Sequence, residues 1–423
     1  MKQQAQVWIG QQAQQLGQVS YVKDGAREYS AFAYDGAWLA ATARFEVSPD
    51  LALIPGYQVR RSPSRDDSVF HHALADTEPD AWGRRVIARA HARARKLDAK
   101  LPALTAFDYL LAVDDFSRVG ALRLRDDTGR FLGDLSERGR HTLLLLDLHR
   151  ALGASRAVEA GSETAEDLKY LQGTGTSLGG MRPKCTLLDN DGTLALGKFP
   201  SLHDQRQVER GEVLAMRLAR EAGIDAAQAR IALVNDTPVA VIKRFDRTPG
   251  GARIPYLSAA SMLQASRQED RSYAELADIV RARCADPVTD LRQLWRRLVF
   301  NLLITNVDDH LQNLGFLHLG GGQWRLAPAF DLNPFPDKDR ESKTWLSEAL
   351  GPITSLDMLL AQAAYFKLSP AEAQVVVAEV HRSVQGWLAM SRSAEVGFTA
   401  LDQEDFGPAF EHAEMQAARA MLS

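Results

Sequence analysis

The chain has 423 residues, of which 45% are hydrophobic and 25% are charged, and its formal net charge is -4. These proportions are typical of folded globular proteins, so they exclude a fibrous protein and a largely disordered one. The length allows two or three domains of about 150 residues each. The small negative charge argues against nucleic-acid binding through an overall basic field, and leaves only a local basic patch open.

Cysteine content and hydropathy indicate the compartment. The chain has only Cys185 and Cys284, which are far apart and lack the spacing of a metal site, so we expect no disulfide framework. The N-terminal residues contain no apolar run of signal-peptide length, and no stretch approaches the ~20 apolar residues of a membrane span. We therefore expect a cytoplasmic protein without membrane contacts.

The first part of the chain, residues 1–140, is predicted to form a β-rich and helical subdomain. Residues 1 to about 60 contain short aromatic segments separated by the turn signals Asp24-Gly25 and Asp35-Gly36, a pattern that predicts short strands. From Pro79 to about Val113 the residues favour helix. The run of Arg and Lys at 84–96 is compatible with a DNA-binding or partner-binding face, but a solvated helix face is the favoured interpretation.

Residues 141–250 are predicted to form a nucleotide-binding lobe. The stretch GTGTSLGGMRPK, which starts at Gly173, is a loop with unusual backbone freedom. It precedes two strands, CTLL and TLALGKF, which read as a hairpin whose second strand carries Lys198. A helix from about Glu209 to Ala222 and a second hairpin, ARIALV with VAVIKRF, complete this part.

A break at residues 248–251 leads to a mainly helical lobe, residues 251–423. Leucines and a tryptophan between Leu291 and Leu302 recur at helical spacing, so one buried helix should end just before the sequence NVDDHLQN at 306–313. The segments LGFLHL and QWRLAP then read as a hairpin, which would return Asp331 to the same cleft.

These acids match the needs of phosphoryl transfer from ATP, which requires a group that orients the attacking hydroxyl and Mg²⁺ that neutralises phosphate charge. Asp308 and Asn313 have the D-x-x-x-x-N spacing that supplies one base and one metal ligand in kinase catalytic loops. Asp331 is a further candidate ligand for Mg²⁺. Asp309 competes with Asp308 for the role of base, and His310 is either a phosphate contact or a packing residue.

The predicted N-lobe offers the cations and backbone donors that phosphates need. Lys198 would contact the phosphates from its strand, and Glu212 on the following helix could pair with it. Gly179 and Gly180 could present their N–H groups to anionic oxygens, with Lys184 close by. The alternative for this glycine cluster is a flexible linker, and the alternative for the acids is a helix or turn cap.

Six segments across residues 177–336 resemble the HipA toxin kinases of bacterial type II toxin–antitoxin systems. In chain order they are SLGGMRPK, LGKFP, RGEVLAMRLAREAGI, VIKRFDR, FNLLITNVDDHLQNLGFL and WRLAPAFDLNPFP. Two further segments, TEPDAWGRR and VGALRLR, resemble the N-terminal half of that family more weakly. The resemblance implies an α+β, two-lobed, kinase-like fold with an N-terminal β-rich subdomain and a mainly α-helical C-terminal lobe.

Residue by residue, the resemblance implies the following site. Asp308 is the catalytic aspartate, Asn313 and Asp331 hold Mg²⁺, and Ser177 is autophosphorylated, with Thr176 as a neighbouring alternative. Phosphorylation would add about -1.5 to -2 charges and could eject the loop from the ATP site. The residues around ATP would be Gly179, Gly180, Met181, Arg182, Pro183, Lys184, Lys198, the hinge residues Lys243, Arg244 and Phe245, then His310 and Phe330, with Glu212 in support.

The resemblance also implies a function and partners. The protein would be a serine/threonine kinase toxin that phosphorylates a translation component such as an aminoacyl-tRNA synthetase. Its partner would be a small helix-turn-helix antitoxin, through which it would reach operator DNA. Two other functions stay open: a co-repressor that binds the antitoxin with little kinase activity, and a small-molecule phosphotransferase, although that group usually has His where Asn306 stands here.

Overall fold

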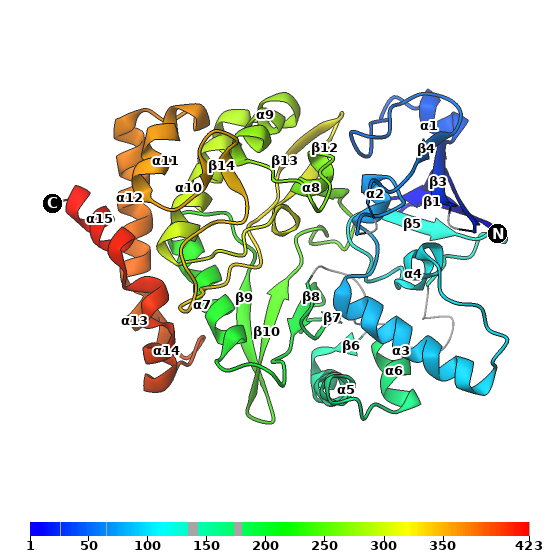
Figure 1. Ribbon diagram of the computed structural model, residues 1–423, viewed down its shortest axis with the longest axis horizontal. Coiled ribbons are helices and arrows are strands. Elements are labelled where there is room, and N and C mark those ends of the chain that lie inside the picture. The colour runs from blue at the N-terminus through cyan, green and yellow to red at the C-terminus, as the bar shows by residue number, and fades with distance from the viewer. Residues whose placement is uncertain (26, 65, 134–142, 173–179, 423) are drawn as a thin grey trace.

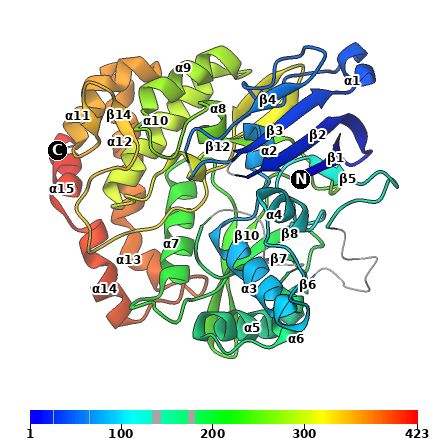
Figure 2. The same ribbon diagram turned by 45° about the vertical axis from the view of Figure 1, so that its right-hand side comes forward.

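The computed structural model describes residues 1–25, 27–64, 66–133, 143–172 and 180–422, and it has three regions (Figures 1 and 2). A blue N-terminal region lies at one end of the long axis, a green sheet with its helices lies in the middle, and an orange and red group of helices lies at the other end. No helix among the described residues is long and apolar enough to cross a bilayer.

Three strands open the chain, strands and helices are then mixed, and among the described residues only helices follow β15. The strands are β1 (Lys2–Ile9), β2 (Gln14–Asp24), β3 (Arg27–Tyr34), β4 (Gln58–Arg60), β5 (Leu122–Arg125), β6 (Leu143–Leu144), β7 (Lys184–Leu188), β8 (Leu194–Lys198), β9 (Ala229–Val234), β10 (Thr237–Lys243), β11 (Tyr256–Ser258), β12 (Gly315–Gly320), β13 (Gln323–Leu326), β14 (Trp345–Ser347) and β15 (Gly351–Pro352).

The longer helices are α3 (Ala81–Leu97), α5 (Leu148–Ala160), α7 (Val208–Glu221), α9 (Tyr273–Arg283), α10 (Pro287–Leu303), α12 (Pro370–Gln385), α14 (Ala400–Phe410) and α15 (Ala413–Met421). The shorter ones are α1 (Gly36–Ala40), α2 (His72–Ala75), α4 (Ala106–Ala112), η2 (Leu145–Asp147), α6 (Ala165–Leu171), α8 (Ala259–Met262), η3 (Leu311–Asn313), α11 (Leu356–Gln362), η4 (Ala363–Phe366) and α13 (Trp387–Ser391).

The N-terminal sheet has the strand order β4-β3-β2-β1-β5. Its strands are antiparallel, and β1 alternates buried and more exposed residues, with Ala5, Val7 and Ile9 turned inward. This alternation is the period of a sheet with one buried face. The predicted strands of this region are therefore confirmed, except that Asp35-Gly36 is no hairpin turn, because the Asp35 carboxylate caps the short helix α1 by accepting from Ala37 N.

The central sheet has the order β6-β7-β8-β10-β9 and helices on both faces. Val239 and Val241 of β10 join one apolar cluster with α5, whereas Ala240 and Ile242 join the cluster that contains α7. Successive residues of a strand point to opposite faces, so β10 is buried on both sides. Both predicted hairpins, β7–β8 and β9–β10, and the predicted helix α7 are confirmed.

Helix α10 organises the C-terminal region. Its leucines and Trp295 are fully buried, and the Trp295 indole donates to Leu359 O at 3.2 Å. The helix is capped by Asp286, which accepts from Thr289 N, and Pro287 occupies the first turn, where its missing N–H costs no hydrogen bond. The next predicted hairpin is confirmed as β12–β13, and β11 joins it in a three-stranded sheet that the sequence did not predict.

The predicted lobe boundary at 248–251 is a tight turn, in which Gly251 N donates to Thr248 O. The predicted boundary at 140/141 lies outside the described residues. Some of the basic residues on α3 form ion pairs within the protein: Arg84 pairs with Glu78, and Arg89 pairs with Glu163. The division into three domains stays a prediction.

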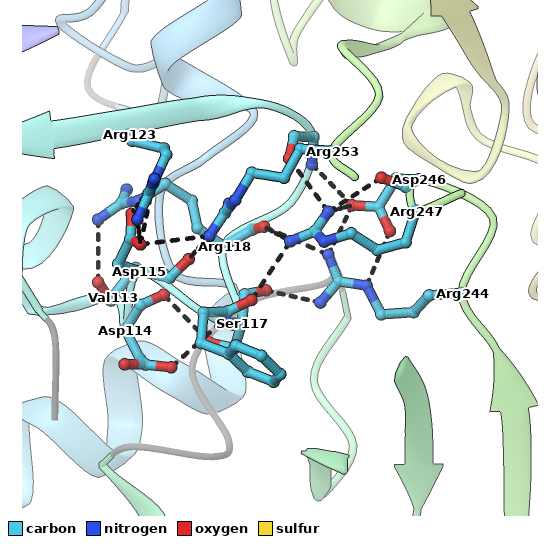
Figure 3. Close-up of polar contacts among 12 residues, drawn as sticks. Val113, Asp114, Asp115, Ser117, Arg118, Arg123, Arg244, Asp246, Arg247 and Arg253 are labelled. Atoms are coloured by element: carbon cyan, nitrogen blue, oxygen red, sulfur yellow. Dashed lines mark hydrogen bonds and ion pairs between the residues drawn. The ribbon is translucent and has the colours of Figure 1, made fainter. Parts of the chain in front are cut away.

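A buried cluster of arginines and aspartates joins the N-terminal region to the segment that follows β10 (Figure 3). Asp246 accepts from Gly120 N at 2.7 Å, from Arg244 Nη2 at 2.6 Å and from Arg247 Nη1 at 2.8 Å. Asp115 pairs with Arg123 and Arg253 in the same way. Because Asp246 is buried, its two arginines replace the water that its charge would otherwise need.

We expect Asp246→Asn to lower the free energy of unfolding at pH 7 by about 3–5 kcal/mol, because two guanidinium groups would lose a buried counter-ion. Burial alone would raise the pKa of Asp246, but the charges of Arg244 and Arg247 hold it well below its usual value. The stabilisation is thus complete above the unfolded pKa of about 3.9 and is lost as the pH falls towards the folded pKa.

Denaturant titrations between pH 3 and 7 would measure this difference. Glu395→Gln is the matched control, because Glu395 forms an exposed pair with Arg217 at 4.0 Å and should contribute nothing measurable. Equal stability of wild type and Asp246→Asn at pH 7 would contradict the structural role of the cluster.

Candidate active site

The buried ammonium group of Lys198 is the centre of the site. It stands at the end of β8 and donates to Glu212 Oε1 on α7 and to Asp331 Oδ1, both at 2.6 Å. Burial alone would lower the pKa of Lys198, but the two carboxylates raise it above its usual value. The predicted pair of Lys198 and Glu212 is therefore present, and the lysine is fully charged.

Asp331 reaches Lys198 through an unusual backbone conformation. Its φ angle is +55°, in the left-handed region that non-glycine residues seldom adopt. Asn333 Nδ2 donates to the same carboxylate at 3.2 Å, and Asn333 N donates to Asn306 Oδ1 at 3.4 Å. The charge of Lys198 outweighs the effect of burial and holds the pKa of Asp331 well below its usual value, so the side chain is an anion.

The loop after α10 carries Asp308 and Asn313. Asn313 Nδ2 donates to the Asp308 carbonyl at 3.1 Å, which explains how the five-residue spacing forms a closed turn. The Asp308 carboxylate is 32% exposed. His310, Asn313, Phe330 and Asp331 line one cavity, so the hairpin β12–β13 does return Asp331 to the neighbourhood of the motif.

Asp309, the competitor for the role of base, is buried and fully engaged. Its carboxylate accepts from the Tyr273 hydroxyl and from Lys343 N, each at 2.7 Å, and its carbonyl accepts from Thr344 Oγ1 at 2.7 Å. Burial raises the pKa of this carboxyl group. Asp309 is 7% exposed and each of its carboxylate oxygens already has a donor, so Asp308 is the more accessible acid of the pair.

The described part of the glycine loop begins at Gly180, so Thr176, Ser177 and Gly179 lie outside the described residues. Gly180 has a φ of +93°, and a β-carbon there would come within 3.0 Å of Lys184 Nζ, so glycine serves the close approach of the loop to this lysine. Lys184 is buried and donates to Asp80 Oδ2 at 2.9 Å. Asp80 also caps α3 of the N-terminal region, by accepting from Gly83 N.

The other loop residues have separate environments. Arg182 donates to Asp204 Oδ1 and to Glu209 Oε1, both at 2.6 Å, so two acids already match its charge. Pro183 is buried and its carbonyl accepts from Phe199 N at 2.9 Å, whereas Met181 is 79% exposed. Among these loop residues, Lys184 acts on Asp331, because its positive charge helps to lower the pKa of the Asp331 carboxyl group.

The predicted hinge residues point in three directions. Lys243 Nζ lies 3.3 Å from Asp191 Oδ2 on the β7–β8 turn, and the Arg244 guanidinium is buried against Asp246 and Ser117 O in the arginine cluster (Figure 3). The Phe245 ring lies 5.4 Å from the Phe330 ring, centroid to centroid. Phe245 and Phe330 thus form an aromatic pair that could flank a base, and the side chains of Lys243 and Arg244 are engaged elsewhere.

Asp331 and Asn313 fit a metal ion whose remaining ligands come from substrate phosphate and water. The described residues contain no group of three or more His, Cys, Asp or Glu that could hold a metal alone. Mg²⁺ is commonly held by one or two carboxylates together with substrate phosphates and water. Asp331, as an anion, and Asn313 line one cavity, and the Nδ1 atom of His310 there is buried without a hydrogen-bond partner among the described residues.

Two residues of this site were not predicted from the sequence. Lys343 forms an ion pair with Asp308, and Asp80 pairs with Lys184. Lys343 follows Asp308 by 35 residues and lies in none of the family-like segments, whereas Asp80 precedes Lys184 by 104 residues and lies in the weaker segment TEPDAWGRR, where no role was predicted for it. Their presence in the site depends on tertiary packing, for which a single sequence contains no local signal.

Comparisons with known proteins give the family and the fold. The profile of the HipA-like C-terminal domain matches residues 176–388. Y4mE of Sinorhizobium fredii is 26% identical over 194 residues, which are 38% of this chain and 43% of that protein. The serine/threonine-protein kinase toxin HipA of Shewanella oneidensis is 25% identical over 184 residues, which are 37% of this chain and 42% of that protein.

The alignments thus span less than half the length of these two relatives. A solved complex of Shewanella oneidensis HipA with HipB and operator DNA contains a chain that superposes with a TM-score of 0.64 at 17% identity, over 99% of this chain and 96% of that one. This match confirms the predicted α+β, HipA-like fold.

The different environments of the two adjacent acids predict different effects on stability. Asp309→Ala should lower the free energy of unfolding by about 1–3 kcal/mol or more, because it leaves the buried Tyr273 hydroxyl and Lys343 N without an acceptor. Asp308→Ala should cost less than about 1 kcal/mol, because its ion pair with Lys343 is half exposed. Denaturant unfolding of both variants would measure this, and a larger loss for Asp308→Ala would contradict the division.

Proposed function

The chain belongs to the HipA family, and on that premise we propose that it is an ATP- and Mg²⁺-dependent serine/threonine protein kinase that acts as the toxin of a toxin–antitoxin pair. The observation that carries the proposal is the contact of Lys198 with both Glu212 and Asp331, beside a loop that presents Asp308 and Asn313. This is the set of groups that phosphoryl transfer requires. The name of the Shewanella oneidensis relative, a serine/threonine-protein kinase toxin, supports the choice of substrate class.

Each residue would have a separate task. Asp308 would accept the proton of the attacking serine hydroxyl, because it is the exposed acid of the loop. Asn313 and Asp331 would hold Mg²⁺, and Lys198 would contact phosphate oxygens while Glu212 keeps it in place. Phe245 and Phe330 would flank the adenine. Bound Mg·ATP would supply the phosphoryl group and neutralise its charge.

The partners follow from the same family. A small helix-turn-helix antitoxin would bind the protein and connect it with operator DNA, as the composition of the Shewanella oneidensis complex suggests. The protein substrate would be a translation component such as an aminoacyl-tRNA synthetase, and Ser177 would be the site of autophosphorylation. The chain itself has no overall basic charge that would favour DNA.

Purified wild-type protein should incorporate label from radioactive ATP in the presence of Mg²⁺. Asp308→Ala should lower the labelling rate by about 10²–10⁴-fold, because general-base catalysis is lost. Ser177→Ala should remove most of the label, with Thr176→Ala as its neighbouring control. Asp339→Ala, which removes an exposed acid between Asp331 and β14, should label normally. Normal Mg·ATP binding without any incorporation by the wild type would refute the autokinase.

Expression without an antitoxin should arrest growth. Asp308→Ala should relieve the arrest at equal protein level, because the arrest would depend on phosphorylation of the target. A growth curve with immunoblotting would measure this, and a short helix-turn-helix protein encoded by the neighbouring gene should restore growth on coexpression. Harmless expression of a kinase that is active in vitro would argue against the toxin role.

A further inference from the structure

Lys343 lies where the reaction would take place. Its ammonium group forms an ion pair with Asp308 Oδ1, and the two side chains are 55% and 32% exposed. Lys343 belongs to the segment between Asp331 and β14, and it lies outside all the segments that resemble the HipA family. An exposed lysine that contacts the proposed base is either a chance surface pair or part of the chemistry.

The backbone around Lys343 argues against a chance pair. Lys343 N donates to Asp309 Oδ1 at 2.7 Å, and Thr344 Oγ1 donates to Asp309 O at 2.7 Å. Ser342 Oγ accepts from Ile353 N at 2.7 Å and donates to Thr344 O at 2.6 Å, which ties the segment to the residue that directly follows β15. Since the carboxylate of Asp309 is itself buried and bound to Tyr273, the segment has a fixed position against the catalytic loop.

The charges around the site indicate why a cation is needed beside Asp308. The cations described around the phosphate side are already matched by acids: Lys198 by Glu212 and Asp331, Arg182 by Asp204 and Glu209, and Lys184 by Asp80. During transfer, Asp308 would have to approach a phosphoryl group of the same sign. A carboxylate and a phosphoryl group repel each other unless a cation lies near both.

Distances limit where such a cation can stand. A hydroxyl oxygen held by Asp308 for proton transfer lies about 2.6–3.2 Å from the carboxylate. In a reactive arrangement it lies about 3–3.5 Å from the phosphorus that it attacks. The γ-phosphorus would thus lie close enough to the Asp308 carboxylate for a single ammonium group to contact the carboxylate and the phosphoryl oxygens together.

We propose that Lys343 is a catalytic residue, whose ammonium group bridges the Asp308 carboxylate and the γ-phosphoryl group during transfer; this rests on the proposed kinase function. Asp308 accepts the hydroxyl proton while the hydroxyl oxygen forms its bond to the γ-phosphorus. The bond from that phosphorus to the bridging oxygen breaks, and its electron pair leaves with ADP. Lys343 keeps its protons throughout and stabilises the charge on the phosphoryl oxygens.

Nucleotide binding tests this contact apart from turnover. Calorimetry would compare Mg²⁺ with a non-hydrolysable ATP analogue against Mg²⁺ with ADP, which lacks the γ-phosphoryl group. Lys343→Met should weaken the analogue by about tenfold, as expected for a charge-assisted hydrogen bond, and ADP by less than about twofold. Lys343→Arg should retain most of the preference for the analogue, because it retains the cation.

A matched lysine in the same segment controls for general electrostatics. Lys338 lies over the Phe335 ring at 4.5 Å and is exposed, so Lys338→Met removes the same charge without touching Asp308. It should leave both affinities unchanged. Lys343→Met keeps its backbone donor to Asp309, so its thermal unfolding midpoint should equal that of the wild type, and its rate of self-labelling should fall by about 10²–10³-fold.

The outcomes separate this inference from the function on which it rests. An unchanged preference for the analogue in Lys343→Met, with an active wild type, overturns the role of Lys343 and leaves the kinase intact. Equal weakening of analogue and ADP also overturns it, because the lysine would then support the structure of the site as a whole. A wild type that binds neither nucleotide overturns the kinase function and this inference together.

Discussion

The buried ammonium of Lys198 is the constraint on which the site depends. It needs two carboxylates to compensate for lost hydration, and these come from α7 and from the turn after β13, more than a hundred residues apart. The central sheet, its helix and the C-terminal region must therefore assemble together before this charge is satisfied. The same contacts explain why Asp331 can keep a positive φ angle, since Lys198 and Asn333 both hold its carboxylate.

The N-terminal region is part of this assembly and not an appendage. Asp80 gives Lys184 its counter-ion while it caps α3, so the start of that helix fixes the end of the glycine loop. The arginine cluster fastens residues 113–120 to the segment after β10 (Figure 3). Arg244 takes part in this cluster, whereas the ring of Phe245 packs against Phe330, which lines the cavity. Two ion-pair systems thus set the position of Lys184, at the end of the loop, and of the hinge.

The features that could be predicted from the sequence are local ones. Asp308 and Asn313 are joined by a turn of fixed length, and both hairpins of the central sheet consist of short apolar strands with turn residues between them. The position of Asp331 followed from the β12–β13 hairpin for the same reason. Asp308 and Asp309 could not be separated in this way, because their difference depends on Tyr273 and Lys343, which approach from other elements.

The cations of the glycine loop also show that the sequence does not reveal partners from distant parts of the chain. Arg182 and Lys184 both looked like phosphate contacts, yet each is paired with acids that lie 22 to 104 residues away. A charge that is already matched offers less to an incoming anion than its sequence position suggests, since a new partner must compete with the old one. Lys343 shows the opposite: nothing in the sequence marks this surface lysine, yet the hydrogen bond of its backbone with Asp309 brings it to the catalytic loop.

The two adjacent acids therefore divide one problem between them. A base must stay exposed enough to meet a hydroxyl, and exposed loops are poorly fixed by their own side chains. Asp309 removes this conflict, because its buried carboxylate and carbonyl hold the loop and the Lys343 segment together while Asp308 stays at the surface of the cleft. Replacing Asp309 would consequently disturb the surroundings of Asp308, so we expect loss of activity in such a variant to reflect the position of Asp308 and not the loss of a proton acceptor.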